Sequence, residues 1–152
     1  MRIAVGSDHG GFKLKENLKD FLQKQGYEAD DFGTDSEKPV DYPDVGFKLA
    51  AAVYKRKAGK GILACKSGIG MTTCANKVKG IRAALCNTRK DAEFSRRHND
   101  SNVIVLPANS LTAKKARTIV EVWLKTQFEG GRHARRIQKI KRYEQKHWKG
   151  MV

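Results

Sequence analysis

Several features of common protein classes are missing from this 152-residue sequence. No apolar run is long enough to cross a bilayer and no signal peptide is recognisable, so we expect a cytoplasmic protein with no membrane partner. The three cysteines form an odd set without CxxC spacing, which argues against a disulfide framework and against a zinc site. No internal repeat or low-complexity linker interrupts the chain, and its length, residues 1–152, suits a single domain.

Acidic residues are scarce beside basic ones: 16 Asp and Glu stand against 31 Lys and Arg, which gives a net charge of +15. This excess favours anionic partners, either phosphorylated metabolites or nucleic acid. It is concentrated in a basic helix expected over about residues 132–148, with Lys149 just beyond it. On charge alone we interpret this helix as solvated surface. Arg132 and Arg136, four residues apart, can either grip a phosphate from one helical face or form a solvated pair.

Short apolar segments alternate with amphipathic segments along the chain. The segments expected as strands are residues 2–7, 27–32, 59–64, 80–85 and 102–106. Helices are expected between Phe12 and Gly26, after Asp44, from Met71, over 91–97 and over 111–127. This alternation predicts a doubly wound, Rossmann-like α/β fold, in which a five-stranded parallel sheet is flanked by helices in three α/β/α layers.

The most informative stretch is the turn after the third expected strand, Cys65-Lys66-Ser67-Gly68-Ile69-Gly70. A buried strand, a glycine turn and a helix start bring backbone N–H groups together around an anion. Cys65 stands at the strand end, where the turn dipoles and Lys66 favour a thiolate, so it is the candidate nucleophile or base. Cys74 and Cys86 are interpreted as packing residues.

Two more pairs of polar residues lie near strand ends. Asp8 and His9 follow the first expected strand, and His98 and Asn99 precede the fifth. Because ligands of doubly wound sheets bind at the carboxyl ends of the strands, we expect both pairs to converge with the Cys65–Gly70 turn. Asp8 is also a good helix N-cap, and a lone histidine such as His98 is often structural, so both interpretations stay open.

Six motifs occur in order along the chain: DHGG (8–11), DYPD (41–44), GILACKSGIGM (61–71), ANKVKGIRAALC (75–86), RRHNDSNV (96–103) and FEGGRHARR (128–136). Together they resemble the type B ribose-5-phosphate isomerase family, which also includes the galactose-6-phosphate isomerase subunits. The match runs from Met1 to about Ile140, and residues 141–152 lie outside it. The resemblance implies aldose–ketose isomerisation of a phosphorylated sugar through an enediolate, with no metal and no cofactor. Ribose 5-phosphate and ribulose 5-phosphate are the expected pair.

The resemblance also implies a homodimer or homotetramer with active sites at subunit interfaces, and it implies residue roles. Cys65 would be the base that takes the proton beside the carbonyl, and Ser67 would move a proton between the two oxygens. His98 would open the sugar ring, assisted by Asp8. The other residues with an implied role bind substrate: Lys66, Gly68, Ile69 and Gly70 hold the enediolate through their N–H groups, Tyr42 and Asn99 contact sugar hydroxyls, and His9, Arg132 and Arg136 bind the phosphate.

The chain departs from the family pattern in two places. The family commonly has Gly-Thr after the cysteine, where this chain has Lys66-Ser67. It often carries a phosphate-binding arginine where this chain has Asn109. Ser67 keeps the hydroxyl, and Lys66 can replace the missing charge. These departures bear on the choice of sugar more than on the reaction, so a hexose 6-phosphate or a modified pentose phosphate stays an alternative substrate.

A non-catalytic protein that binds phosphate or nucleic acid on the same fold is the alternative from another functional class. It would use the basic C-terminal helix. Cys65, Ser67 and His98 speak against it, because binding alone needs no base. Nucleic acid is therefore not expected as a partner.

Overall fold

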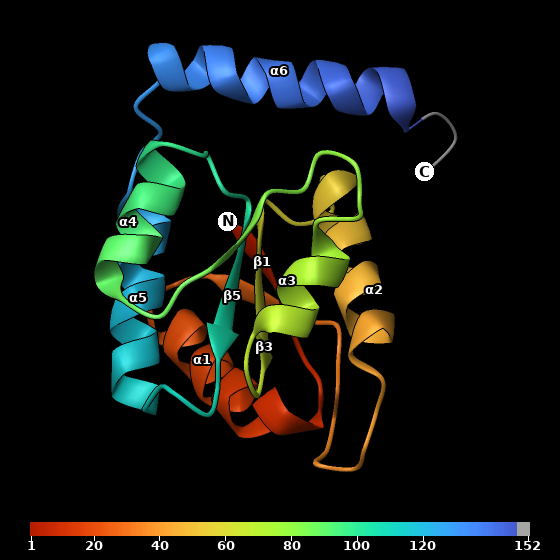
Figure 1. The fold of residues 1–152 in the computed structure, drawn as a ribbon. Coiled ribbons are helices and arrows are strands. Elements are labelled where there is room, and N and C mark those ends of the chain that lie inside the picture. The colour runs from red at the N-terminus through yellow and green to blue at the C-terminus, as the bar shows by residue number, and fades with distance from the viewer. Residues whose placement is uncertain (149–152) are drawn as a thin grey trace.

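The computed structural model describes residues 1–148, and Lys149 of the predicted basic tail lies outside them. Five parallel strands form one sheet in the order β2-β1-β3-β5-β4 (Figure 1). The strands are β1 (Arg2–Ser7), β2 (Glu28–Asp31), β3 (Lys60–Cys65), β4 (Ala83–Leu85) and β5 (Val103–Pro107). The helices are η1 (His9–Gly11), α1 (Phe12–Lys24), α2 (Tyr42–Tyr54), α3 (Ile69–Ala75), α4 (Arg89–Arg97), α5 (Ala113–Lys125) and α6 (Arg132–His147). The predicted doubly wound fold is confirmed.

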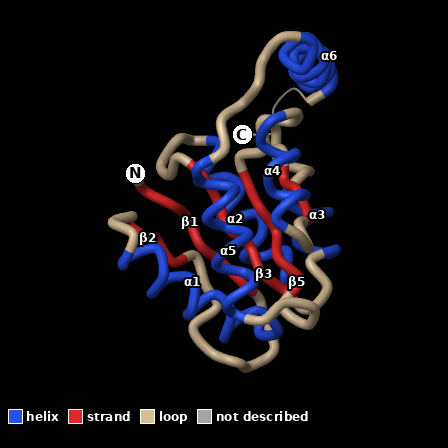
Figure 2. The backbone as a smooth tube through the Cα atoms, turned by 90° about the vertical axis from the view of Figure 1, so that its left-hand side faces the viewer, coloured by secondary structure: helices blue, strands red, loops and turns tan. Residues whose placement is uncertain are grey.

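Two apolar clusters cover the faces of the sheet, between the sheet and the helices that flank it in Figure 2. Helices α1, α4 and α5 enclose one cluster, in which Leu18 and Trp123 are buried. Helices α2 and α3 enclose the other, around Leu49 and Met71. Strand residues alternate between the two clusters, as the pleat requires of a sheet buried on both faces. The polar residues of a site are therefore left to the two ends of the sheet.

Some element bounds differ from the predicted ones for local reasons. The strand expected over 80–85 shortens to β4 because Gly80 has φ of 77° and belongs to a turn. Helix α4 begins earlier than expected because Thr88 and Asp91 form a capping box. Helix α5 begins directly after Thr112, whose side chain accepts the Lys115 N–H. Caps and turn glycines, rather than the apolar pattern, set these ends.

Helix α6 lies across the end of the sheet at which the strands begin, apart from the other layers (Figures 1 and 2). Ile137 on its inner face is buried, and the Glu144 carboxylate accepts the Gly80 N–H at 3.2 Å. Ile140 and Tyr143 of the same helix remain 47% and 62% exposed. Within residues 1–148, no helix combines the length and apolarity needed to span a membrane.

Candidate active site

Cys65 ends β3 and is 5% exposed. Its Sγ accepts the N–H of Gly68 at 3.2 Å. Gly68 has φ of +75°, and a Cβ at this position would collide with the Leu85 side chain, so the turn requires glycine. As the N-cap of α3, Gly68 also offers no side chain to the first helical turn. N–H groups at the start of α3 therefore remain available beside the thiol, except that of Ile69, which Ser67 Oγ accepts at 3.3 Å.

The turn after β1 carries Asp8 and His9. Oδ1 of Asp8 accepts the N–H groups of Gly10 and Gly11 at 2.9 and 3.1 Å, so Asp8 is the N-cap of η1 and one carboxylate oxygen remains for chemistry. Nδ1 of His9 accepts the Val40 N–H at 3.2 Å. The proton of the neutral imidazole must then lie on Nε2, which makes Nε2 a donor suited to a phosphate oxygen.

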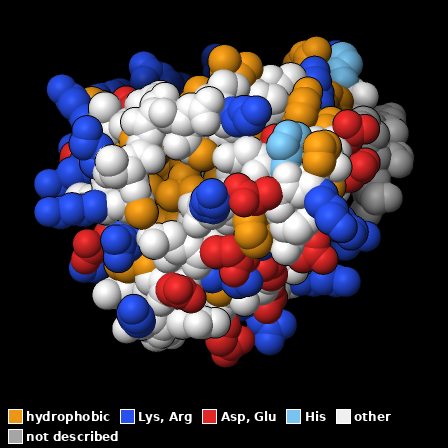
Figure 3. All heavy atoms as spheres, turned by 90° about the horizontal axis from the view of Figure 1, so that it is seen from below, with side chains coloured by type: hydrophobic (Ala, Val, Ile, Leu, Met, Phe, Trp, Pro, Cys, Tyr) orange, Lys and Arg blue, Asp and Glu red, His pale blue; other side chains and the backbone are white. Residues whose placement is uncertain are grey.

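Three more predicted residues lie at the same end of the sheet. The Lys66 stem covers Gly10, where an added Cβ would meet Lys66 Cε and Cδ at 3.2 and 3.3 Å. The Tyr42 ring lies against Gly70 in the same way, 2.9 Å from the place of a Cβ. The Asn109 N–H donates to the Lys66 carbonyl at 3.0 Å. Figure 3 looks onto this end, where hydrophobic side chains lie in a recess among Lys and Arg side chains.

We call this group the thiol half-site. Its members are the predicted residues at the end of the sheet where the strands finish: Asp8, His9, Tyr42, Cys65, Lys66, Ser67, Gly68, Ile69, Gly70 and Asn109.

His98 and Asn99 directly follow α4, which ends at the opposite end of the sheet (Figure 1). Helix α4 runs against the strand direction, so the turn after it lies where β5 begins. Asn102 of this turn accepts the N–H of Gly61, near the start of β3, at 2.9 Å. At about 3.3 Å per residue, Cys65 lies on the order of 13 Å farther along the strand. The predicted convergence of His98 and Asn99 with Cys65 is wrong within one chain.

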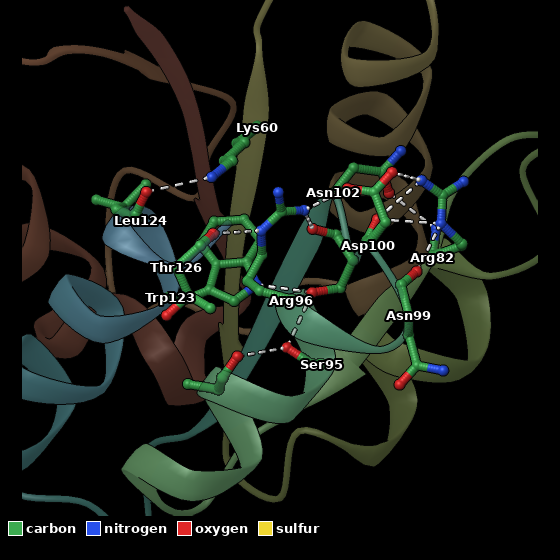
Figure 4. Close-up of polar contacts among 12 residues, drawn as sticks. Lys60, Arg82, Ser95, Arg96, Asn99, Asp100, Asn102, Trp123, Leu124 and Thr126 are labelled. Carbon is green, nitrogen blue, oxygen red and sulfur yellow. Dashed lines mark hydrogen bonds and ion pairs between the residues drawn. The ribbon is translucent and has the colours of Figure 1, made fainter. Parts of the chain in front are cut away.

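Two arginines hold the turn that carries Asn99 (Figure 4). Arg96 donates to Oδ1 of Asp100 at 2.9 Å, and Arg82 donates to Oδ2 at 3.0 Å. Arg82 also donates to the Asn99 carbonyl at 2.9 Å. Asp100 has φ of 46°, a conformation that non-glycine residues adopt at a cost and that these bonds stabilise. Both guanidinium groups form hydrogen bonds within the protein, and these bonds fix the shape of the turn.

The His98 ring is stacked between Phe94 and His133, with centroid distances of 4.9 and 4.3 Å. Its Nε2 lies 3.4 Å from Oε2 of Glu129. Arg97 donates to the other oxygen of Glu129 at 3.0 Å and holds the pKa of this carboxyl below its ordinary value. Burial, aided by the charge of His98, lowers the pKa of His133.

Ligand atoms of His98, Glu129 and His133 lie within 4.8 Å of one another, a grouping that a metal ion can exploit. Two features of this grouping argue against it. Imidazole binds a metal in the plane of its ring, and two stacked rings only 12° from parallel cannot both aim at one ion. Arg97 and Arg132 add positive charge beside the cluster, which repels a cation. The cluster is better suited to holding a proton.

Arg132 and Arg136 lie on exposed positions of α6, next to His133 and at the same end as His98. We call His98, Asn99, Glu129, Arg132, His133 and Arg136 the histidine half-site. Sequence reasoning missed Glu129 and His133, although both stand in the motif FEGGRHARR. The available signal was a carboxylate and an imidazole four residues apart at a helix start.

Comparison with known proteins decides the family. Residues 3–140 match the family model described as Ribose/Galactose Isomerase. The chain belongs to this family. Ribose-5-phosphate isomerase B of Clostridium thermocellum is similar in structure, with a TM-score of 0.95 and 48% identity over 97% of this chain and 99% of that one. The resemblance carried by the six motifs is confirmed, and this family member is an aldose–ketose isomerase of sugar phosphates.

Two relatives differ in the substrate that their names print. Ribose-5-phosphate isomerase B of Escherichia coli is 41% identical over 145 residues, which are 95% of this chain and 97% of that protein. D-erythrulose-4-phosphate isomerase of Pectobacterium atrosepticum is also 41% identical, over 146 residues and 95% of each chain. Both names describe an isomerase, and the sugars that they name differ in length.

Proposed function

We propose that this isomerase interconverts ribose 5-phosphate and ribulose 5-phosphate through an enediolate, without a metal or other cofactor. The observation that carries the proposal is the Cys65 turn, where the sulfur lies 3.2 Å from the Gly68 nitrogen beside the uncapped start of α3. A base next to preorganised donors is what proton abstraction beside a carbonyl needs. The names of the ribose-5-phosphate isomerase relatives support the sugar, and a hexose 6-phosphate or a modified pentose phosphate remains the alternative.

In this proposal Cys65 takes the proton from carbon 2 of the open-chain aldose. N–H groups of the turn after Cys65 that have no partner there, such as that of Gly70, hold the enediolate charge while Ser67 carries a proton from one oxygen to the other. The thiol then returns its proton to carbon 1, which gives the ketose with no net gain or loss of atoms. The other cysteines do not compete, because burial raises the pKa of Cys74 and raises that of Cys86 to about 12.

The two half-sites lie at opposite ends of one chain, so a complete site needs two chains. We therefore propose a homodimer or homotetramer in which the thiol half-site of one subunit faces the histidine half-site of another. His98 would protonate the ring oxygen while the free oxygen of Asp8 takes the anomeric proton. The remaining members would bind substrate: His9, Arg132 and Arg136 at the phosphate, Tyr42 and Asn99 at sugar hydroxyls. A fully active monomer in sedimentation analysis would contradict this assembly.

The proposed reaction is tested by ketose formation from ribose 5-phosphate, galactose 6-phosphate and erythrose 4-phosphate. We expect turnover of ribose 5-phosphate, unchanged by a chelator. Cys65→Ala should abolish turnover and leave binding of the sugar phosphate within about a few-fold of the parent. No ketose from any of the three, or full turnover in the variant, would refute the proposal.

The charge of α6 does not call for a nucleic-acid partner, because Arg132 and Arg136 have a task in the proposed site. The exclusion of nucleic acid stays a prediction, as does the cytoplasmic location. Binding to duplex DNA that weakens steeply with added salt would contradict the prediction that nucleic acid is not a partner.

A further inference from the structure

Glu129 has no part in the steps above, although its carboxylate lies 3.4 Å from His98. Arg97 fixes it at two points. The Arg97 guanidinium donates to Oε1 at 3.0 Å, and the Arg97 carbonyl accepts the Glu129 N–H at 3.0 Å. Oε2 remains, and it faces two imidazoles, 3.4 Å from Nε2 of His98 and 3.7 Å from Nε2 of His133. One carboxylate oxygen is thus close to both histidines.

The stacking leaves His98 with two usable edges. Phe94 and His133 cover its two faces, at interplanar angles of 14° and 12°. Nε2 lies 3.4 Å from Oε2 of Glu129, an ion-pair distance rather than a formed hydrogen bond, and no residue within 1–148 forms a hydrogen bond to Nδ1. His133 itself is 7% exposed, and its Nε2 is buried without a hydrogen-bond partner. The Nδ1 edge of His98 is the one left for a ligand.

Three arginines lie near the histidine pair, and one of them, Arg97, also pairs with Glu93 at 2.9 Å. Arg97, Arg132 and Arg136 lie beside it, and Glu129 is the acidic group that approaches both rings among the described residues. A positive charge on His98 therefore has Glu129 as its counter-ion.

We propose that Glu129 is a positioning residue for ring opening: Oε2 accepts the Nε2–H of His98 and balances the imidazolium, which presents Nδ1–H to the sugar. This inference rests on the proposed function, in which His98 opens the ring. The proton passes from Nδ1 to the ring oxygen as the bond from that oxygen to carbon 1 breaks. The anomeric hydroxyl loses its proton to Asp8. A carboxylate behind an imidazole fixes tautomer and orientation in the same manner in hydrolase triads.

The substitution Glu129→Gln tests whether Glu129 sets the position of the proton on His98. Arg97 donates at the Oε1 position, so it will hold the amide oxygen of the glutamine there. The amide NH₂ then takes the place of Oε2 and faces Nε2 of His98. A donor at this place requires an unprotonated Nε2, so the proton of neutral His98 should move to Nδ1.

Nitrogen-15 NMR of the histidine-labelled full chain at alkaline pH reports which ring nitrogen carries the proton, and His98→Asn assigns the signal. We expect Nε2–H in the parent and Nδ1–H in Glu129→Gln. Glu129→Asp, which keeps the charge, should retain Nε2–H. The matched control Glu121→Gln should also retain Nε2–H on His98, because the Glu121 carboxylate that it removes pairs with Lys125 on α5. The same tautomer in parent and Glu129→Gln would overturn the inference.

Kinetics give a second readout. Glu129→Gln should lower kcat/KM for ribose 5-phosphate by about 10²-fold, the usual contribution of a positioned proton donor. Erythrose 4-phosphate cannot close a five-membered ring, because its O4 carries the phosphate, so its kcat/KM should change by less than about two-fold. Equal losses on both sugars would reduce Glu129 to a structural role and overturn the inference. A parent that converts neither sugar but shows the tautomer switch would refute the proposed function and leave the Glu129–His98 contact standing.

Discussion

Two inactive variants should restore activity when their chains are mixed. Cys65→Ala damages the thiol half-site and leaves His98 intact, and His98→Asn does the reverse. The two residues lie at opposite ends of the sheet, separated by on the order of 13 Å of strand, so one chain cannot bring them together. A mixed oligomer, in contrast, contains sites in which the intact half of each chain meets the other.

The expected recovery of activity follows from the fraction of sites in which both half-sites are intact. In a random equal mixture, half of the thiol half-sites and half of the histidine half-sites are intact, so about one quarter of the sites are complete. The fraction is the same for a dimer and for a tetramer whose sites form between pairs of chains. The two variants are co-refolded, and ketose formation from ribose 5-phosphate is compared with the refolded parent at equal concentration.

A matched mixture serves as the control. Cys65→Ala mixed with Asp8→Asn should recover nothing, because both changes lie in the thiol half-site and every site then carries one of them. If Cys65→Ala and His98→Asn together show no more than the sum of their separate activities, the shared site is refuted.

Three further predictions concern single positions. Gly68→Ala should lower turnover by about 10²-fold because its Cβ would collide with Leu85, whereas Gly26→Ala, also at positive φ but in open space, should keep the parent's kcat. Arg136→Lys should raise KM by about ten-fold, since a lysine cannot form the two parallel bonds of a guanidinium, and Arg135→Lys should leave KM unchanged in the same assay. Burial lowers the pKa of Lys60 to about 8, so Lys60→Met should raise the free energy of unfolding by about 1–2 kcal/mol at pH 7, after discounting for solvent. Because the Lys60 cation is disfavoured only in the folded state, this gain should shrink as pH rises from 8 through 10.5, and equal gains in urea unfolding at pH 7 and pH 10.5 would contradict it.

The fold could be predicted because its signals are local. Strands β3 and β5 are buried on both faces and appear as uninterrupted apolar runs, and glycines or polar turns separate them from amphipathic helices. The ends of the elements were harder to predict, although the capping box of Thr88 and Asp91 is itself a sequence pattern. The apolar period alone, without this cap, predicts the start of α4 too late in the chain.

Only half of the site could be predicted correctly from the sequence, and the reason is topological. A residue that directly follows a strand, such as Asp8 or Lys66, must lie at the carboxyl end of a parallel sheet. A residue between a crossover helix and the next strand, such as His98, must lie at the amino end, because the helix has carried the chain back. The contact of His98 with Glu129 could not be predicted from the sequence, because it depends on how the chain after α5 returns across the end of α4.

The two departures from the family pattern turn out to be neighbours. The Asn109 N–H bonds to the Lys66 carbonyl, so an arginine at 109 and a lysine at 66 would belong to the same half-site. The Lys66 stem runs over Gly10, next to His9, whose Nε2–H is free to donate. An ammonium held there can supply the charge that Asn109 does not. A lysine, however, is a single mobile point of charge and sets the phosphate position less narrowly than a planar guanidinium would. We therefore expect this member of the family to accept sugar phosphates of different length more evenly than relatives that carry the arginine.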